Sequence, residues 1–254
     1  MRKNNLPIGI FDSGIGGLTV VKEIVRELPN ESIIYLGDTA RIPYGTRSKE
    51  VIVKFSLELV NFLLTKNVKA LVVACNTISA NALEEIKKIS PVPVVDVISA
   101  TKKIVTGRAG VIATAGTISS GAYASVAKFS QACPLFVPFA EEGITSGTAI
   151  EEIARGYLSG LKKAKIDTLI LGCTHYPLLR SVIAKTMGNK VQLIESGEPT
   201  AKKLREILQK SGLLQTKLKP HFEFYFTDNP ERVVKTAEKF FGQKLPGKII
   251  KIEL

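Results

Sequence analysis

The chain alternates short apolar runs, rich in β-branched residues, with longer segments of helical periodicity. The runs that predict strands are residues 6–11, 32–37, 70–75, 92–97, 109–114, 134–139, 168–173, 191–195 and 221–226. The segments that predict helices include residues 18–29, 49–67, 78–89, 148–164 and 177–187. Continuous apolar strands between helices are typical of a parallel sheet covered on both faces. We therefore expect a doubly wound α/β architecture, in which ligands bind at the carboxyl ends of the strands.

Two segments of the first half resemble two segments of the second half, in the same order and at nearly the same separation. Residues 9–14 resemble residues 110–115, and VKALVVACNT, ending at Thr77, resembles IDTLILGCTH, ending at His175. Chance similarity between hydrophobic strands is the alternative. The repeat predicts two similar domains with largely parallel sheets, related by a pseudo-twofold axis, with the active site in the cleft between them.

The expected domains are not both continuous in the sequence. Residues 1–97 plus 210–254 would form the first α/β domain, because the last strand returns to complete it. Residues 98–209 would form the second α/β domain, and the proline-bearing segment 92–100 would be the crossover between them.

Composition is that of an ordinary globular protein, with 45% hydrophobic and 23% charged residues among 254. No apolar run is long enough for a membrane span, and the N-terminus lacks the apolar stretch of a signal peptide, so we expect a cytoplasmic protein. The formal net charge is +12. Lysines are spread along the chain without an aromatic–basic motif, which favours a solvated basic surface over a nucleic-acid site. This charge would also attract an anionic substrate.

Three cysteines and two histidines limit the possible chemistry. No CxxC pair is present, which argues against a disulfide framework, and two histidines are too few for a typical zinc site. We therefore expect no metal. Free cysteines are usually inert core residues unless their surroundings activate them.

A glycine-rich loop, Asp12-Ser13-Gly14-Ile15-Gly16-Gly17, follows the first expected strand and opens a helix. Glycines here let backbone N–H groups approach an anion at the helix N-terminus. The loop lacks the dinucleotide fingerprint, because Thr19 stands where the third glycine would fall. A generic strand–helix turn, with Asp12 and Ser13 as an ordinary helix cap, is the alternative.

Cys75 and Cys173 each end one of the two similar strands. Either alone would be read as a buried structural cysteine, but their equivalent placement favours a function. A thiol near a helix N-terminus has a lowered pKa, and His175 is close enough in sequence to exchange a proton with Cys173. Two such thiols in one cleft would present an acid and a base to opposite faces of a single carbon. Cys133 has no such twin and is predicted to be a core residue.

Six motifs in order carry a resemblance to a known family. They are FDSGIGG, LGDTARIPYG, ACNT, GAY, AEEG and LGCTHYPLL. Together they closely resemble the cofactor-independent glutamate racemases of bacterial cell-wall synthesis, over about residues 8–199. The resemblance implies interconversion of L- and D-glutamate without a cofactor, supply of D-glutamate for peptidoglycan, and a homodimer.

The same resemblance implies a role for each matching residue. Cys75 and Cys173 would be the two acid/base thiols, Asp12 would assist Cys75, and His175 would assist Cys173. Glu141, rather than the alternative Glu142, would orient His175. The implied substrate-binding residues are Asp12, Ser13, Tyr44, Gly45, Asn76, Thr77, Thr114, Thr117, Thr174 and His175.

Two departures from the family pattern weaken the assignment of Thr117. Family members often have Gly-Thr where this chain has Ala113-Thr114, and the stretch from Tyr123 to Cys133 is shorter than in the family.

Several other functions remain open at this point. A racemase for aspartate or hydantoins would share the two thiols, whereas a decarboxylase of the same superfamily would need only one. A non-enzymatic binder of acidic amino acids has no use for two thiols. A thiol hydrolase would use Cys173 and His175 as nucleophile and base and form a covalent intermediate.

Overall fold

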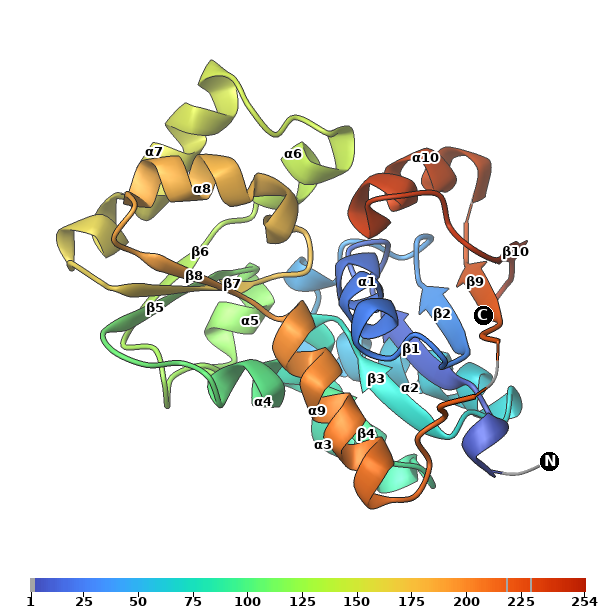
Figure 1. The fold of residues 1–254 in the computed structure, drawn as a ribbon. Coiled ribbons are helices and arrows are strands. Elements are labelled where there is room, and N and C mark those ends of the chain that lie inside the picture. Colours follow the sequence, from blue (N-terminus) through green and yellow to red (C-terminus); the bar gives the residue numbers. More distant parts are fainter. Residues whose placement is uncertain (1–2, 218, 229) are drawn as a thin grey trace.

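Two parallel sheets form the core of the protein in the computed structural model, which describes residues 3–217, 219–228 and 230–254 (Figure 1). The larger sheet contains β1 (Ile8–Asp12), β2 (Ile33–Gly37), β3 (Ala70–Val73), β4 (Val94–Asp96), β9 (Phe222–Phe226) and β10 (Lys248–Lys251). The smaller sheet contains β5 (Ala109–Ala113), β6 (Phe129–Ala132), β7 (Thr168–Gly172) and β8 (Gln192–Glu195). The predicted two-domain α/β fold with largely parallel sheets is confirmed.

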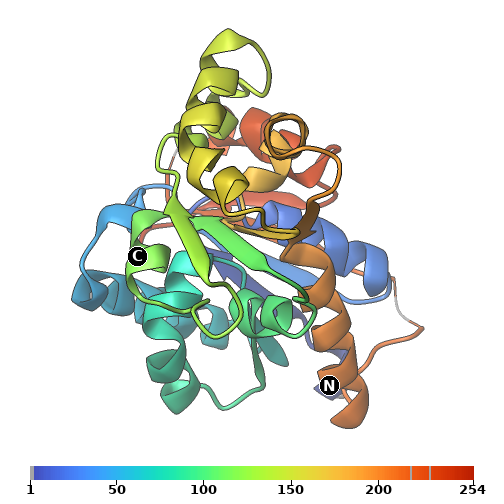
Figure 2. The ribbon, with the colours of Figure 1, turned by 90° about the vertical axis from the view of Figure 1, so that its left-hand side faces the viewer.

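The two sheets share one topology. The larger sheet has the strand order β10-β9-β2-β1-β3-β4 and the smaller has β6-β5-β7-β8, with parallel pairing throughout the described strands. The order β2-β1-β3-β4 therefore repeats as β6-β5-β7-β8. Both pairs of similar segments found in the sequence fall on equivalent strands, β1 with β5 and β3 with β7. The strands β9 and β10 extend the larger sheet alone (Figure 1). Figure 2 views the molecule from the side of the smaller sheet.

Helices cover both sheets, as the continuous apolar strands require. They are α1 (Leu18–Glu27), α2 (Lys49–Thr65), α3 (Asn76–Ile89), α4 (Val97–Lys102), α5 (Ala115–Ser119), α6 (Phe136–Glu142), α7 (Thr148–Lys163), α8 (Arg180–Met187), α9 (Gly197–Lys210) and α10 (Pro230–Phe241). Short 3-10 helices are η1 (Lys3–Asn5), η2 (Tyr44–Thr46) and η3 (Tyr176–Leu179).

The alternating side chains of β1 show how each face of the larger sheet is buried. Ile8 and Ile10 pack in one cluster with α1, whereas Phe11 packs in the other with α2 and α3.

The predicted domain boundaries, at residues 97/98 and 209/210, remain a prediction. Helix α9 packs against α1 and α4 (Figure 1). None of the described helices is long and apolar enough to cross a membrane.

The prediction of a strand at residues 134–139 is wrong, because this segment begins helix α6. An uninterrupted apolar run does not distinguish a strand from a short buried helix. Phe136 and Ala140, four residues apart, are both buried on one helix face. Pro138 lies in the first turn, where its missing N–H has no intrahelical partner to lose. The edge strands β6 and β10 were not predicted, since both mix polar and apolar residues.

Candidate active site

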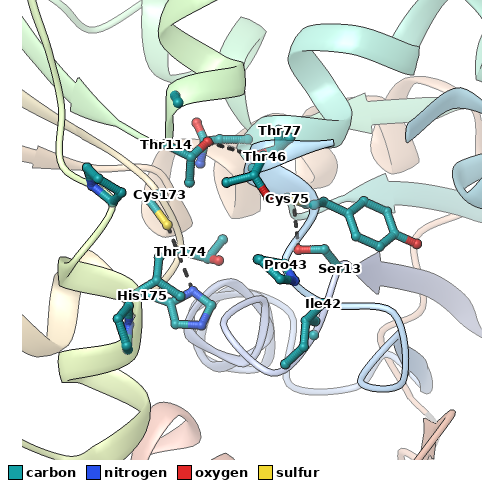
Figure 3. Close-up of a pocket in the computed structure, with 18 of the residues that line it drawn as sticks. Ser13, Ile42, Pro43, Thr46, Cys75, Thr77, Thr114, Cys173, Thr174 and His175 are labelled. Carbon is teal, nitrogen blue, oxygen red and sulfur yellow. Dashed lines mark hydrogen bonds between the residues drawn. The ribbon is translucent and has the colours of Figure 1, made fainter. Parts of the chain in front are cut away.

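A cavity of about 380 Å³ lies between the carboxyl ends of the strands of the two sheets (Figure 3). Both Cys75, two residues beyond β3, and Cys173, one residue beyond β7, line it. The larger sheet also contributes Ser13 after β1 and the loop through η2, and the smaller sheet contributes residues after β5 and β7 and from α6. The cleft that the repeat predicted therefore exists, with one thiol from each half.

Cys75 lies on the side of the larger sheet, directly before the first residue of α3. Its Sγ is 3.4 Å from Ser13 Oγ. Burial of the side chain, reinforced by the nearby Asp12 carboxylate, raises the pKa of the Cys75 thiol to about 12. The helix N-terminus, which was expected to lower this pKa, is outweighed.

Asp12 lies behind Cys75 at the end of β1 and is fully buried. Its Oδ2 accepts hydrogen bonds from the backbone N–H groups of Gly17 (2.9 Å) and Gly14 (3.3 Å). Its Oδ1 has no hydrogen-bond partner among the described residues. Burial raises the pKa of Asp12, although the nearby His175 and the two N–H groups oppose this rise. Asp12 is therefore a carboxyl group with one oxygen available for a proton.

Cys173 has a different partner set. Its Sγ is 3.8 Å from His175 Nδ1, and His175 Nε2 is 2.9 Å from Glu141 Oε1, so thiol, imidazole and carboxylate form a chain. Burial alone would lower the pKa of His175, but the hydrogen bonds with Cys173 and Glu141 outweigh it and raise this pKa to about 10. Glu141 is thus the glutamate of the AEEG motif that contacts His175.

Hydroxyl and amide groups gather at the end of the cavity near α3 and α5. Thr77 Oγ1 is 2.9 Å from Thr114 Oγ1 (Figure 3). Thr117 Oγ1 lies 3.1 Å from Thr114 Oγ1. Asn76 Oδ1 accepts a hydrogen bond from Tyr123 (2.7 Å), while its buried Nδ2 has no partner among the described residues. These groups can donate hydrogen bonds to a carboxylate.

Most of the predicted substrate-binding residues line the cavity. They are Ser13, Tyr44, Gly45, Asn76, Thr77, Thr114, Thr174 and His175. Asp12 and Thr117 do not line it. Each lies behind a residue that does: Asp12 is next to Cys75, and Thr117 is next to Thr114. The Tyr44 hydroxyl donates to Asp38 rather than pointing into the cavity.

Apolar residues form the rest of the wall and were not predicted from the sequence. They are Ile42, Pro43, Ala115, Pro134, Val137 and Pro138, accompanied by Thr46. The loop that carries Ile42 and Pro43 is anchored through buried Asp38, which also accepts hydrogen bonds from Arg41 Nε (2.6 Å) and Thr227 (2.8 Å). The DTARIPYG motif was the signal that this loop belongs to the site, but it did not indicate which residues face the cavity.

Cys133 is fully buried at the end of β6, with its Sγ 3.7 Å from the Gln131 carbonyl. Burial raises the pKa of its thiol. Among the described residues, no group of three or more His, Cys, Asp or Glu side chains is arranged to hold a metal ion.

Comparisons with known proteins agree with this geometry. A family model described as Asp/Glu/Hydantoin racemase matches residues 8–204. The glutamate racemase of Geobacter metallireducens is 48% identical, with 97% of this chain and 96% of that protein aligned. The glutamate racemase of Aquifex aeolicus is 46% identical, over 96% of this chain and 97% of that protein. A crystal structure of glutamate racemase from Francisella tularensis in complex with D-glutamate superposes with a TM-score of 0.94 at 43% identity, covering 98% of both chains.

Proposed function

The chain belongs to the Asp/Glu/hydantoin racemase family, and on this premise we propose that it interconverts L- and D-glutamate by two-base proton transfer. The observation that carries the proposal is the pair of thiols, Cys75 and Cys173, which line one cavity from equivalent strand ends. The substrate assignment is supported by the full-length similarity to glutamate racemases.

Inversion at the α-carbon requires a proton donor and a proton acceptor on opposite faces. In the proposed mechanism one thiolate removes the α-proton and the opposite thiol delivers a proton to the other face. The two thiols exchange roles in the reverse reaction. A single base would usually return the proton to the face from which it came. A decarboxylase or a simple binding protein would have no use for the second thiol.

The neighbours of each cysteine would manage its proton. Asp12 Oδ1 is free to take a proton from Cys75, and the raised pKa of Asp12 makes this transfer less unfavourable. The substrate ammonium group would add a positive charge, which lowers a thiol pKa. On the other side, protonated His175, held by Glu141, would stabilise the thiolate of Cys173.

The transition state resembles a carbanion, and the protein would stabilise it with hydrogen bonds. Ser13, Asn76 and Thr77 offer donors close to Cys75, and Thr174 offers one close to Cys173. Such donors, already in place, contribute most in a closed and dry site. This electrostatic stabilisation would replace the electron sink of a pyridoxal cofactor, so we expect catalysis without a cofactor or metal.

The cellular role is part of the same proposal. D-glutamate produced by this reaction would supply peptidoglycan synthesis in the cytoplasm. The homodimer implied by the resemblance remains a prediction that light scattering would test, and nucleic acid is not expected as a partner.

The proposal is tested by incubating the purified protein with L-glutamate in D₂O. Loss of optical rotation, with deuterium entering at the α-carbon, would establish racemisation by proton exchange. Aspartate and a hydantoin run in parallel would test the substrate: exchange with either of them but not with glutamate would overturn the substrate assignment. Absence of exchange with all three would overturn the two-thiol mechanism, and a covalent adduct detected by mass would then favour the thiol hydrolase.

A further inference from the structure

The segment that carries Cys173 and His175 is held by a residue of the other half of the molecule. Thr19, in the first turn of α1, places its Oγ1 at 3.0 Å from the carbonyl oxygen of Thr174. Thr19 belongs to the larger sheet's half, whereas Thr174 follows β7 of the smaller sheet. This hydrogen bond therefore joins the two halves at the residue that follows Cys173.

The local sequence explains why the Thr174 carbonyl needs a partner from elsewhere. The carbonyls on either side of it are satisfied locally, Cys173 by the N–H of Tyr176 and His175 by the N–H of Leu178, both at 3.2 Å. The residue three positions after Thr174 is Pro177, which has no N–H to donate. The Thr174 carbonyl therefore has no local donor, and Thr19 supplies one in a partly buried position.

Thr19 Oγ1 also lies 2.9 Å from the carbonyl oxygen of Gly16, but that contact is not equivalent to the one with Thr174. A hydroxyl has a single proton to donate, and the Gly16 carbonyl already accepts the backbone N–H of Thr19 at 3.0 Å. Removing the hydroxyl would leave Gly16 with a donor, whereas Thr174 would lose the donor that Thr19 provides. Asp12 would keep its own hydrogen bonds from Gly14 and Gly17.

We propose that Thr19 is a positioning residue for the Cys173 side of the active site, holding the Thr174 peptide so that Cys173 and His175 face the substrate. The inference rests on the proposed two-thiol function. Thr174 lies between Cys173 and His175, so a shift of its peptide moves both side chains. A displacement of about 1 Å in a reacting group can slow a reaction about 10²-fold. Loss of the Thr19 hydroxyl should therefore slow proton transfer by Cys173 and leave proton transfer by Cys75 nearly unchanged.

The test measures each face separately by chloride elimination from the two enantiomers of a single diastereomer of 3-chloroglutamate. A thiolate takes the α-proton, the released electron pair forms the Cα–Cβ double bond, and chloride leaves from Cβ. Hydrolysis of the resulting enamine gives 2-oxoglutarate and ammonium. Only one base is needed, so each enantiomer reports one thiol, and the Cys75→Ser and Cys173→Ser variants establish which enantiomer belongs to which thiol.

The variants to compare are Thr19→Val, which keeps the side-chain shape, and Thr19→Ser, which keeps the hydroxyl. Thr19→Ala is a second variant without the hydroxyl if Thr19→Val does not fold. For Thr19→Val we expect kcat for elimination on the Cys173 face to fall about tenfold to a hundredfold. The Cys75 face should stay within about twofold of the wild type, and Thr19→Ser should restore most of the lost rate.

Each other outcome has a distinct meaning. Equal slowing of elimination on both faces would show a merely structural role for Thr19 and would overturn the inference. Unchanged rates on both faces would overturn it as well. Neither result would contradict the two-thiol function. If the two cysteine variants show no facial division at all, the proposed function fails and the inference fails with it.

Discussion

The ends of β3 and β7 occupy equivalent places in the two halves, yet their surroundings differ. Cys75 lies next to a buried carboxyl group and a serine hydroxyl, Asp12 and Ser13. Cys173 lies next to an imidazole that is itself bonded to a carboxylate, His175 and Glu141. The repeated topology places two thiols around one cavity, but it does not repeat the groups beside them.

This difference teaches that the two faces of the site are matched in geometry and not in electrostatics. The Asp12 carboxylate raises the pKa of Cys75 further above the value set by burial. Protonated His175 brings a positive charge to Cys173 instead. The proposed mechanism can use both arrangements, because each thiol would act as base in one direction and as acid in the other. The comparison can be tested by changing one half at a time.

The largest effects are expected from removing either thiol. Cys75→Ser and Cys173→Ser should each lower racemisation by at least about 10²–10⁴-fold, because a serine hydroxyl is a far weaker acid and its alkoxide is hardly populated at neutral pH. Optical rotation of L- and D-glutamate samples measures this. Near wild-type turnover in either variant would contradict the two-thiol mechanism. Each variant should still catalyse elimination from one enantiomer of a halogenated analogue.

The next largest effect is expected at Gly16, where the two halves meet without room for a side chain. A β-carbon at Gly16 would overlap Thr174 Oγ1 and the ring of His175. Gly16→Ala should therefore move Cys173 and His175 relative to Cys75 and lower kcat about 10²-fold. Gly156→Ala is the matched control, because a β-carbon there meets no atom within 4 Å. Equal activity of the two alanine variants would mean that the contact at Gly16 does not set the distance between the faces.

A smaller and pH-dependent effect is expected for Glu141→Gln. Its carboxylate is one of the groups that raise the pKa of His175 to about 10, so His175 in the variant should lose its proton at a lower pH. With the pKa raised above the unfolded value of about 6.5, protonated His175 stabilises the fold fully below about pH 6.5. This contribution is lost as the pH rises through about 10. In the variant, the loss should occur at lower pH.

NMR titration of the imidazole protons measures this directly. The chain has two histidines, and a His221→Gln variant identifies the His175 signal. His221 is exposed and paired with Glu223, away from the cavity. Thermal unfolding followed against pH should show the same shift of the window. An unchanged His175 titration in Glu141→Gln would contradict the assigned role of Glu141.

The same comparison shows how much of the site can be predicted from the sequence. Strand ends can be predicted from the sequence, because an apolar run followed by Cys75 or Cys173 marks both the strand and its carboxyl end. The direction of a side chain cannot: Tyr44 belongs to a predicted motif, yet its hydroxyl donates a hydrogen bond to Asp38. Contacts between the two halves, such as Thr19 with Thr174, depend on how the sheets are placed relative to each other, which no local pattern encodes.

Helix α6 shows a second limit. Its apolar run was predicted to be a strand, but Phe136 and Ala140 pack as one helix face and deliver Glu141 to His175. The glutamate itself was identified through the AEEG motif. Motif and apolar run thus carried different information: the apolar run predicted the wrong element, whereas the motif marked the glutamate that contacts His175.

The smallest effect is expected for Cys133, which ends β6 and so offers a third strand-end thiol for comparison. Unlike the other two cysteines, it does not line the cavity, and its thiol bonds only weakly, to the Gln131 carbonyl. Cys133→Ala should keep racemisation within about twofold of the wild type. It should lower the free energy of unfolding by about 1–2 kcal/mol, because a small buried cavity replaces the sulfur atom. Urea unfolding measures the stability and optical rotation measures the activity. A loss of activity without a loss of stability would mean that Cys133 takes part in the chemistry. Lining the cavity would then not separate catalytic from core thiols.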